Sequence, residues 1–135
     1  MFGGFKRKSS APAGTQSELV RFANQYLDLA LMGRPAAYYK RVAGSRKAMG
    51  YVWGVHDAYA QRLGMEPGQA PSSAPHFGAS YATLFGRSAT DMYFKSAFEL
   101  HDDPDHRAGE QMGGEDVFDF LDKGKNFSRL LDLLQ

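Results

Sequence analysis

The sequence predicts an all-α fold, a single-domain bundle of four to six helices with a flexible N-terminal arm. Apolar residues recur at intervals of three and four along most of the chain, the spacing that marks one face of an α-helix. Isoleucine is absent and no segment alternates β-branched with polar residues, so nothing indicates a strand. The 135 residues, 43% of them hydrophobic, suffice for one core and are too few for two comfortable domains.

Residues 1–14 form a polar, basic arm whose aromatic side chains are Phe2 and Phe5. Such a segment buries too little apolar surface to order itself, so the helical domain is predicted to span residues 15–135. The arm lacks the apolar run of a signal peptide, and no stretch of the chain is long and apolar enough for a membrane helix. We therefore expect a cytoplasmic protein without a membrane partner.

A first helix is predicted near residues 16–32. Thr15 and Glu18 fit a capping box, in which each side chain bonds the backbone amide of the other residue. Gly33 supplies a left-handed stop, and Pro35 suits the first turn of a second helix, which would form a hairpin with the first. The apolar stripe of the first helix is Leu19, Phe22, Ala23, Tyr26, Leu27 and Ala30.

The second helical stretch covers residues 35–63, with a break expected near Gly44 because glycine costs a helix about 1 kcal/mol relative to alanine. After the break, Gly50, Gly54 and Ala58 form a row of small residues spaced by four. Small residues let a neighbouring helix approach closely, so this row predicts a packing seam. Trp53 and Tyr59 are expected to add buried area beside it.

The functional alternative for this stretch is a metal or acid–base site at His56 and Asp57. Adjacent helical residues point about 100° apart, so the two side chains do not reach one small site on an unbroken helix. The pattern G-Y-V-x-G-V-x-D-A over residues 50–58 also resembles a segment of the periplasmic immunity proteins of type VI secretion. Those proteins carry an export signal and cysteines, whereas this chain has no cysteine.

A long loop is predicted over residues 64–76, since it holds three prolines and two glycines. A short helix over 77–85 follows and ends at Gly86. Residues 88–91 then offer a cap for an aromatic-rich helix. Its neighbouring side chains Met92, Tyr93 and Phe94 cannot all face one core, so some are expected to meet a partner subunit or another helix.

The segment "HDDPDHRAGEQMGGED" is typical of a polar turn between helices, and two short helices are predicted after it, the first beginning near Gly113 and Gly114. Its oxygen and imidazole groups suit zinc, manganese or calcium, but the spacing matches no established metal motif. The leucines after residue 129 predict a C-terminus docked on the core, and residues 123–125 an interruption before it. The weak metal candidates are His101, Asp103, Asp105 and His106.

Charge divides the chain into a basic and an acidic half. Residues 1–67 hold ten Lys/Arg and four Asp/Glu, and residues 68–135 hold six and eleven. A basic helix and arm with neighbouring tyrosines indicate possible contacts to nucleic acid phosphates, although the near-neutral total charge argues against it. The candidate contacts are Lys6, Arg7, Lys8, Lys40, Arg41, Arg46 and Lys47.

No phosphate-binding glycine loop, nucleophile elbow or dinucleotide fingerprint occurs, so we expect no enzyme and no cofactor. The sequence favours a protein–protein interaction module, an adaptor or assembly subunit that binds a protein partner or itself. A short, cysteine-free chain with a polar arm also suits a phage or mobile-element origin. The alternatives are a DNA-associated regulator and a small immunity- or inhibitor-type protein. The expected interaction residues are Trp53, Tyr59, Met92, Tyr93 and Phe94.

Overall fold

A computed structural model of the chain describes residues 13–65, 70–125 and 128–135. Residues 1–12 lie outside these ranges, and with them most of the predicted arm. Every regular element in the described ranges is helical, which confirms the predicted all-α fold. The elements are α1 (Ala13–Ala30), the 3₁₀ turn η1 (Pro35–Tyr38), α2 (Tyr39–Ala43), α3 (Arg46–Arg62), α4 (Ala70–Phe85), α5 (Ala89–Phe94), the π-helical segment η3 (Lys95–Glu99), α6 (Pro104–Lys123) and the 3₁₀ turn η4 (Leu131–Leu134).

The first two helical boundaries follow the sequence with one correction. α1 ends at Ala30, two residues before the predicted end, and the predicted left-handed stop is confirmed: Gly33 has φ +73° and its amide donates to the Asp28 carbonyl at 2.7 Å. Its start is earlier than the predicted capping box, so Thr15 lies inside the helix. The Glu18 carboxylate instead accepts from the Tyr59 hydroxyl at 2.8 Å. The break near Gly44 is confirmed, and Ser45 caps α3 by accepting from the Ala48 amide.

Two predictions in the second half are wrong. α4 begins at Ala70, within the predicted loop 64–76, since Pro71 occupies the first turn, where a missing amide costs nothing. α6 is continuous from Pro104 and does not begin at Gly113. Asp103 caps it by accepting from the amides of Asp105 and His106 at 2.9 and 3.1 Å. The predicted end before residue 125 is confirmed, with Gly124 at φ +68°.

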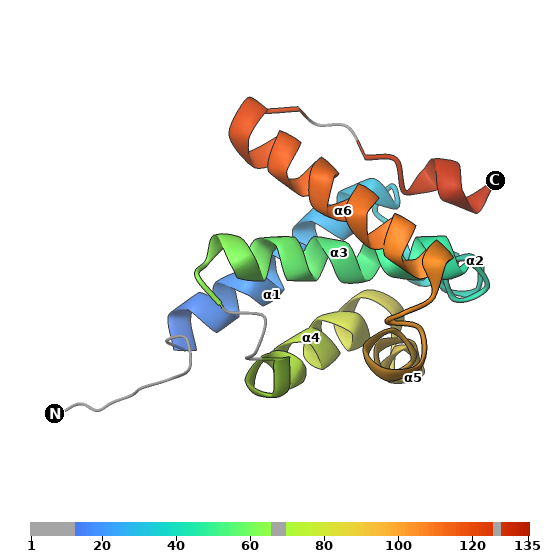
Figure 1. The fold of residues 1–135 in the computed structure, drawn as a ribbon, viewed down its shortest axis with the longest axis horizontal. Helices are drawn as coiled ribbons and strands as arrows, with labels where there is room; N and C mark the ends of the chain where they lie inside the picture. The colour runs from blue at the N-terminus through green and yellow to red at the C-terminus, as the bar shows by residue number, and fades with distance from the viewer. Residues whose placement is uncertain (1–12, 66–69, 126–127) are drawn as a thin grey trace, which may run out of the picture.

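α3 and α6 form the central pair of the fold and run in the same direction (Figure 1). An ion pair joins the start of each helix, Arg46 with Asp103 at 2.8 Å. A second joins their ends, Arg62 with Asp122 at 2.6 Å. The basic and acidic halves of the sequence thus partly neutralise each other inside one chain.

Glycines bring the backbones of these two helices into direct contact. A Cβ added to Gly50 or Gly54 would overlap the carbonyl of His106 or Glu110 on α6. A Cβ on Gly109 or Gly113 would overlap the carbonyl of Lys47 or Tyr51 on α3. We call this contact the seam, defined by those four glycines. It confirms the packing predicted from the small-residue row on α3.

The remaining helices cover the other faces of α3. Figure 1 shows α4 and α5 on the side of α3 away from α6, and α1 packs against both α4 and α3. The C-terminal segment returns to the core, where Leu130 is fully buried, so the predicted docking of the C-terminal leucines is confirmed. In the described ranges, no helix has the length and apolar character to cross a membrane.

Candidate interaction site

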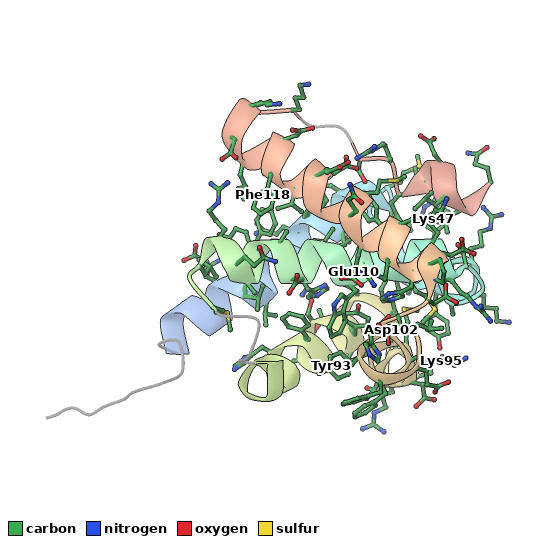
Figure 2. The ribbon with its side chains drawn as sticks, viewed as in Figure 1. Lys47, Tyr93, Lys95, Asp102, Glu110 and Phe118 are labelled. Atoms are coloured by element: carbon green, nitrogen blue, oxygen red, sulfur yellow. The ribbon has the colours of Figure 1, made fainter. Side chains whose placement is uncertain are left out.

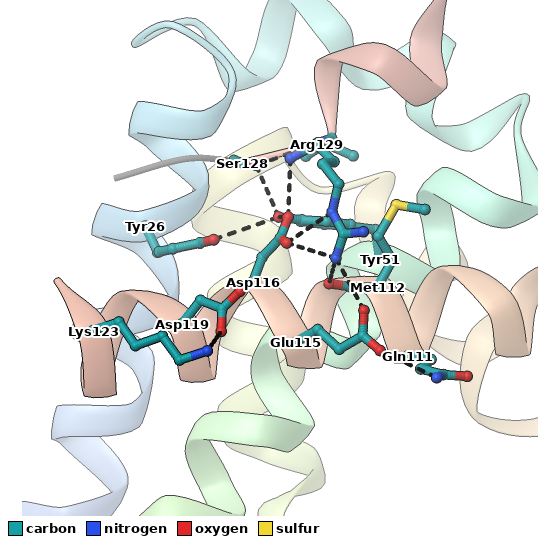
Figure 3. Close-up of polar contacts among 11 residues, drawn as sticks. Tyr26, Tyr51, Gln111, Met112, Glu115, Asp116, Asp119, Lys123, Ser128 and Arg129 are labelled. Carbon is teal, nitrogen blue, oxygen red and sulfur yellow. Dashed lines mark hydrogen bonds and ion pairs between the residues drawn. The ribbon is translucent and has the colours of Figure 1, made fainter. Parts of the chain in front are cut away.

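A buried carboxylate organises the region where α6 meets the C-terminal segment (Figure 3). Asp116 is 3% exposed and accepts from the Tyr51 hydroxyl at 2.6 Å. It also accepts from the backbone amide and the Nε of Arg129, both at 2.9 Å. A second Arg129 nitrogen reaches Glu115 at 3.1 Å. The carboxylate is therefore paired and hydrogen-bonded, which makes its burial tolerable.

Two further hydroxyls extend this network toward the surface. Ser128 Oγ lies 2.8 Å and Tyr26 Oη 3.4 Å from Tyr51 Oη. Burial raises the pKa of both tyrosines, so both phenols keep their protons. Because Tyr51 donates its proton to Asp116, Ser128 and Tyr26 are the donors toward Tyr51. The network fixes the side chains of Tyr26 and Ser128 in place.

These two side chains line a groove of about 570 Å³ between α1, the end of α6 and the C-terminal segment. A second hollow of about 600 Å³ adjoins it, sharing Met32 and Leu131. Apolar atoms dominate the groove, and Leu29 and Met32 at its rim are 78% and 60% exposed. We call the combined hollow the trough; its lining is Phe22, Gln25, Tyr26, Leu29, Ala30, Met32, Tyr38, Arg41, Phe120, Ser128, Leu131, Leu134 and Gln135.

Aromatic contacts hold the trough open. Phe22 stacks on Tyr59 of α3 with ring centroids 3.9 Å apart, and Tyr26 meets Phe120 of α6 edge-on at 5.7 Å. The contacts of Phe22 and Tyr26 with Phe120 lie between α1 and α6, whereas glycines let the backbones of α3 and α6 touch. The trough is consequently a surface built on two long helices, with side chains already positioned.

His56 belongs to the core. It is fully buried, its Nδ1 donates to the Val52 carbonyl at 2.8 Å, and its Nε2 accepts from Ser80 Oγ at 2.7 Å. Burial lowers the pKa of His56 to about 4, so the ring is neutral. Asp57 bonds Gln61 instead, at 2.9 Å. The serine–histidine geometry suits nucleophile activation, but both residues are 0% exposed, so the pair works as a packing contact.

The four weak metal candidates do not converge. His106 is fully buried, with Nε2 2.9 Å from Ser96 Oγ and Nδ1 3.3 Å from Glu110. Asp103 is the helix cap, and its bond from the His106 amide lowers the pKa of its carboxyl. His101 and Asp105 are exposed. Across residues 13–65, 70–125 and 128–135, no three His, Asp or Glu side chains are placed to hold a metal ion.

A polar hollow of about 380 Å³ lies between α3 and α6. Its walls include Asp57, Glu110 and Phe118, and Figure 2 shows the last two along α6. Burial, and to a smaller degree the charge of Glu110, raises the pKa of the Asp57 carboxyl. Arg107 shares the hollow, so its charges are mixed.

The predicted interaction residues divide between core and surface. Met92, Tyr93 and Tyr59 are buried, and Trp53 is half-buried against Phe77 and Tyr93. Phe94 is 51% exposed and stacks on Phe98, which is 68% exposed. Binding of a partner by these residues stays a prediction.

Sequence reasoning missed the trough. Its one usable signal was Leu29, which follows Tyr26 by three residues and Phe22 by seven and so widens the apolar stripe of α1 beyond its buried side. Such a residue on a helix is a candidate for a second, solvent-facing apolar surface. The other lining residues come from segments far apart in the chain, and only the fold brings them together.

The candidate nucleic-acid contacts differ in their surroundings: some are exposed and others contact neighbouring residues of the chain. Lys40 and Arg41 are exposed on α2, and the Arg41 guanidinium lies 5.7 Å from the Tyr38 ring centre. Arg46 is paired with Asp103, and the Lys47 carbonyl belongs to the seam. Lys6, Arg7 and Lys8 lie outside the described residues.

No family model matches the chain, and neither curated proteins nor solved structures give a match.

Proposed function

We propose that this chain is a non-enzymatic interaction subunit that docks an amphipathic helix of a partner protein in the trough. The observation that carries the proposal is the combination of an apolar hollow with exposed apolar side chains, Leu29 and Met32, at its rim. Contiguous exposed apolar surface of this kind marks interaction sites. An amphipathic helix fits because its apolar face presents anchors every three or four residues to a groove between helices.

Other features of the molecule agree with a binding role. Neither buried serine–histidine pair offers an exposed nucleophile, since Ser80 and Ser96 are 0% and 1% exposed. The network around Asp116 holds the floor of the trough rigid, which lowers the ordering cost of binding.

The test is selection of amphipathic helical peptides against the full chain, followed by NMR mapping. We expect selected peptides to shift the methyl signals of Leu29, Met32 and Leu131. Leu29→Gln combined with Met32→Gln should weaken binding at least about tenfold, because two apolar anchors are lost. Phe98→Gln is the matched control: Phe98 is similarly exposed but lies outside the trough, so affinity should not change. Peptides that map to Phe94 and Phe98 would contradict the proposal.

A DNA-associated role is the second proposal, supported by the exposed Lys40 and Arg41 beside Tyr38 and Tyr39. Phosphate contacts release counterions, so affinity for short DNA should fall steeply between roughly 50 and 200 mM salt. Lys40→Gln with Arg41→Gln should weaken it further. Fluorescence anisotropy measures both effects, and absence of binding at the lower salt would end this alternative.

A further inference from the structure

We infer that the trough also binds the chain's own N-terminal arm, with Phe2 and Phe5 filling the groove until a partner displaces them. The inference rests on the proposed function, because both treat the trough as a docking surface. Residues 1–12 lie outside the described structure; the groove's lining, the sequence of the arm and the distance between them support the inference.

The aromatic side chains of the arm match the apolar and aromatic lining of the groove. Among the residues that the structure describes, none with a charged side chain lines the groove beside α1, and its walls include Phe22, Tyr26 and Phe120. Phe2 and Phe5 are the arm's aromatic side chains. Aromatic rings packed against aromatic walls gain both burial and favourable ring geometry.

The arm is long enough to reach the groove within the same chain. Phe5 lies eight residues before Ala13, so extended chain spans at most about 28 Å between them. Along α1, Phe22 and Leu29 lie about 13 and 24 Å from Ala13 at about 1.5 Å per residue. Ser9, Ser10 and Pro12 are of the residue types that favour turns, which suits a chain that folds back along the helix.

The spacing of the two phenylalanines also agrees with the groove. Phe2 and Phe5 are three positions apart, which is about 10 Å in an extended chain. Phe22 and Leu29 line the same groove and are about 10.5 Å apart along α1. Phe5 near Phe22 therefore places Phe2 near Leu29.

Docking within one chain is favoured over docking between copies. A short tether gives an effective concentration on the order of millimolar, far above ordinary protein concentrations in solution. Weak contacts then suffice to fill the trough, and a partner that binds more tightly still displaces the arm. An arm that occupies the groove nine-tenths of the time would weaken the partner's apparent affinity about tenfold.

Paramagnetic relaxation in NMR tests this placement directly. The chain has no cysteine, so Gly3→Cys gives a unique site for a nitroxide label between the two phenylalanines. We expect the methyl signals of Leu29 and Met32 to lose most of their intensity, while that of Met92 on α5, across α3 from α6, is retained. Adding Phe2→Ser and Phe5→Ser should restore the Leu29 and Met32 signals several-fold.

Two other relaxation results would overturn the inference. Equal broadening of all methyls would mean that the arm has no preferred site. Broadening in a mixture where one set of chains carries the nitroxide and another set carries the isotope would assign the groove to a second copy. Peptide affinity separates this inference from the proposed function: peptides that bind the trough equally well with and without Phe2 and Phe5 would leave the function intact and exclude the arm. If the arm docks in the trough but no peptide binds there, the inference about the arm holds and the proposed function is wrong.

Discussion

The seam and the trough are two solutions to the packing of helices on the same scaffold. At the seam, glycines on α3 and α6 let two backbones touch, and ion pairs fix both ends. At the trough, the aromatic rings of Phe22, Tyr26 and Phe120 keep α1 away from the end of α6, and a hollow remains. Side-chain size at the contact thus decides whether a helix pair becomes closed core or binding surface.

The largest effect on stability is expected from adding a side chain at a glycine of the seam. Gly109→Ala places a methyl group against the Lys47 carbonyl and 2.9 Å from the Tyr51 amide, and backbone cannot move aside as a flexible side chain does. Overpacking at such a site should lower the free energy of unfolding by about 3 kcal/mol or more. Urea denaturation measures the loss.

Gly114→Ala is the matched control on the same helix. Its added Cβ meets only the Ala58 Cβ, at 3.8 Å, an ordinary contact. Replacing glycine by alanine in a helix should then raise the free energy of unfolding by up to about 1 kcal/mol. Stabilisation of similar size by both substitutions would mean that helix propensity, rather than the seam, governs these positions.

The difference between these two glycines shows how far sequence carries the fold. The spacing of Gly50, Gly54 and Ala58 predicts that α3 receives a close neighbour, but it does not identify the neighbour. Gly109 and Gly113 repeat the same spacing on α6. Their surroundings of acids and a proline instead favour the interpretation as a polar turn, which the structure shows to be wrong. The polar composition of the segment favoured the turn prediction. The four-residue spacing of Gly109 and Gly113 indicates a helix contact only once α3 is known to pack there.

Acid should weaken the fold through His56. Its pKa in the folded state, about 4, is below its ordinary value of 6.5. Between these two pH values the unfolded chain therefore binds a proton at His56 and the folded chain does not. The contribution to stability is therefore complete above pH 6.5 and is lost as the pH falls from 6.5 to 4, on the order of 3 kcal/mol in total. Unfolding free energies measured across this range should show it.

The variant that isolates this effect is His56→Gln. The glutamine side chain does not titrate, so stability should fall less steeply between about pH 6.5 and 4 than in the parent, even though the substitution itself costs packing. Parallel pH profiles for the two proteins would show that other groups cause the acid sensitivity.

The network beneath the trough should give the next effect. Asp116→Asn removes the charge that accepts hydrogen bonds from Arg129 and Tyr51, and it keeps the shape of the side chain. Breaking a buried ion pair costs several kcal/mol, but Arg129 is 33% exposed and regains water, so about 2 kcal/mol is expected. Thermal unfolding measures it. Asp119→Asn, which breaks an exposed pair with Lys123 on the same helix, should change stability by less than about 0.5 kcal/mol.

The smallest effect is expected at the rim of the trough. Leu29→Gln should alter the free energy of unfolding by less than about 0.5 kcal/mol, because the side chain is 78% exposed and buries little in the free chain. Leu27→Ala, two positions away and fully buried, should cost about 2–5 kcal/mol and calibrates the same urea assay. If Leu29 contributes little to the stability of the fold, its exposed side chain remains available to contact a bound partner. A large loss at Leu29 would instead make the rim part of the core and remove the reason to treat the trough as a docking surface.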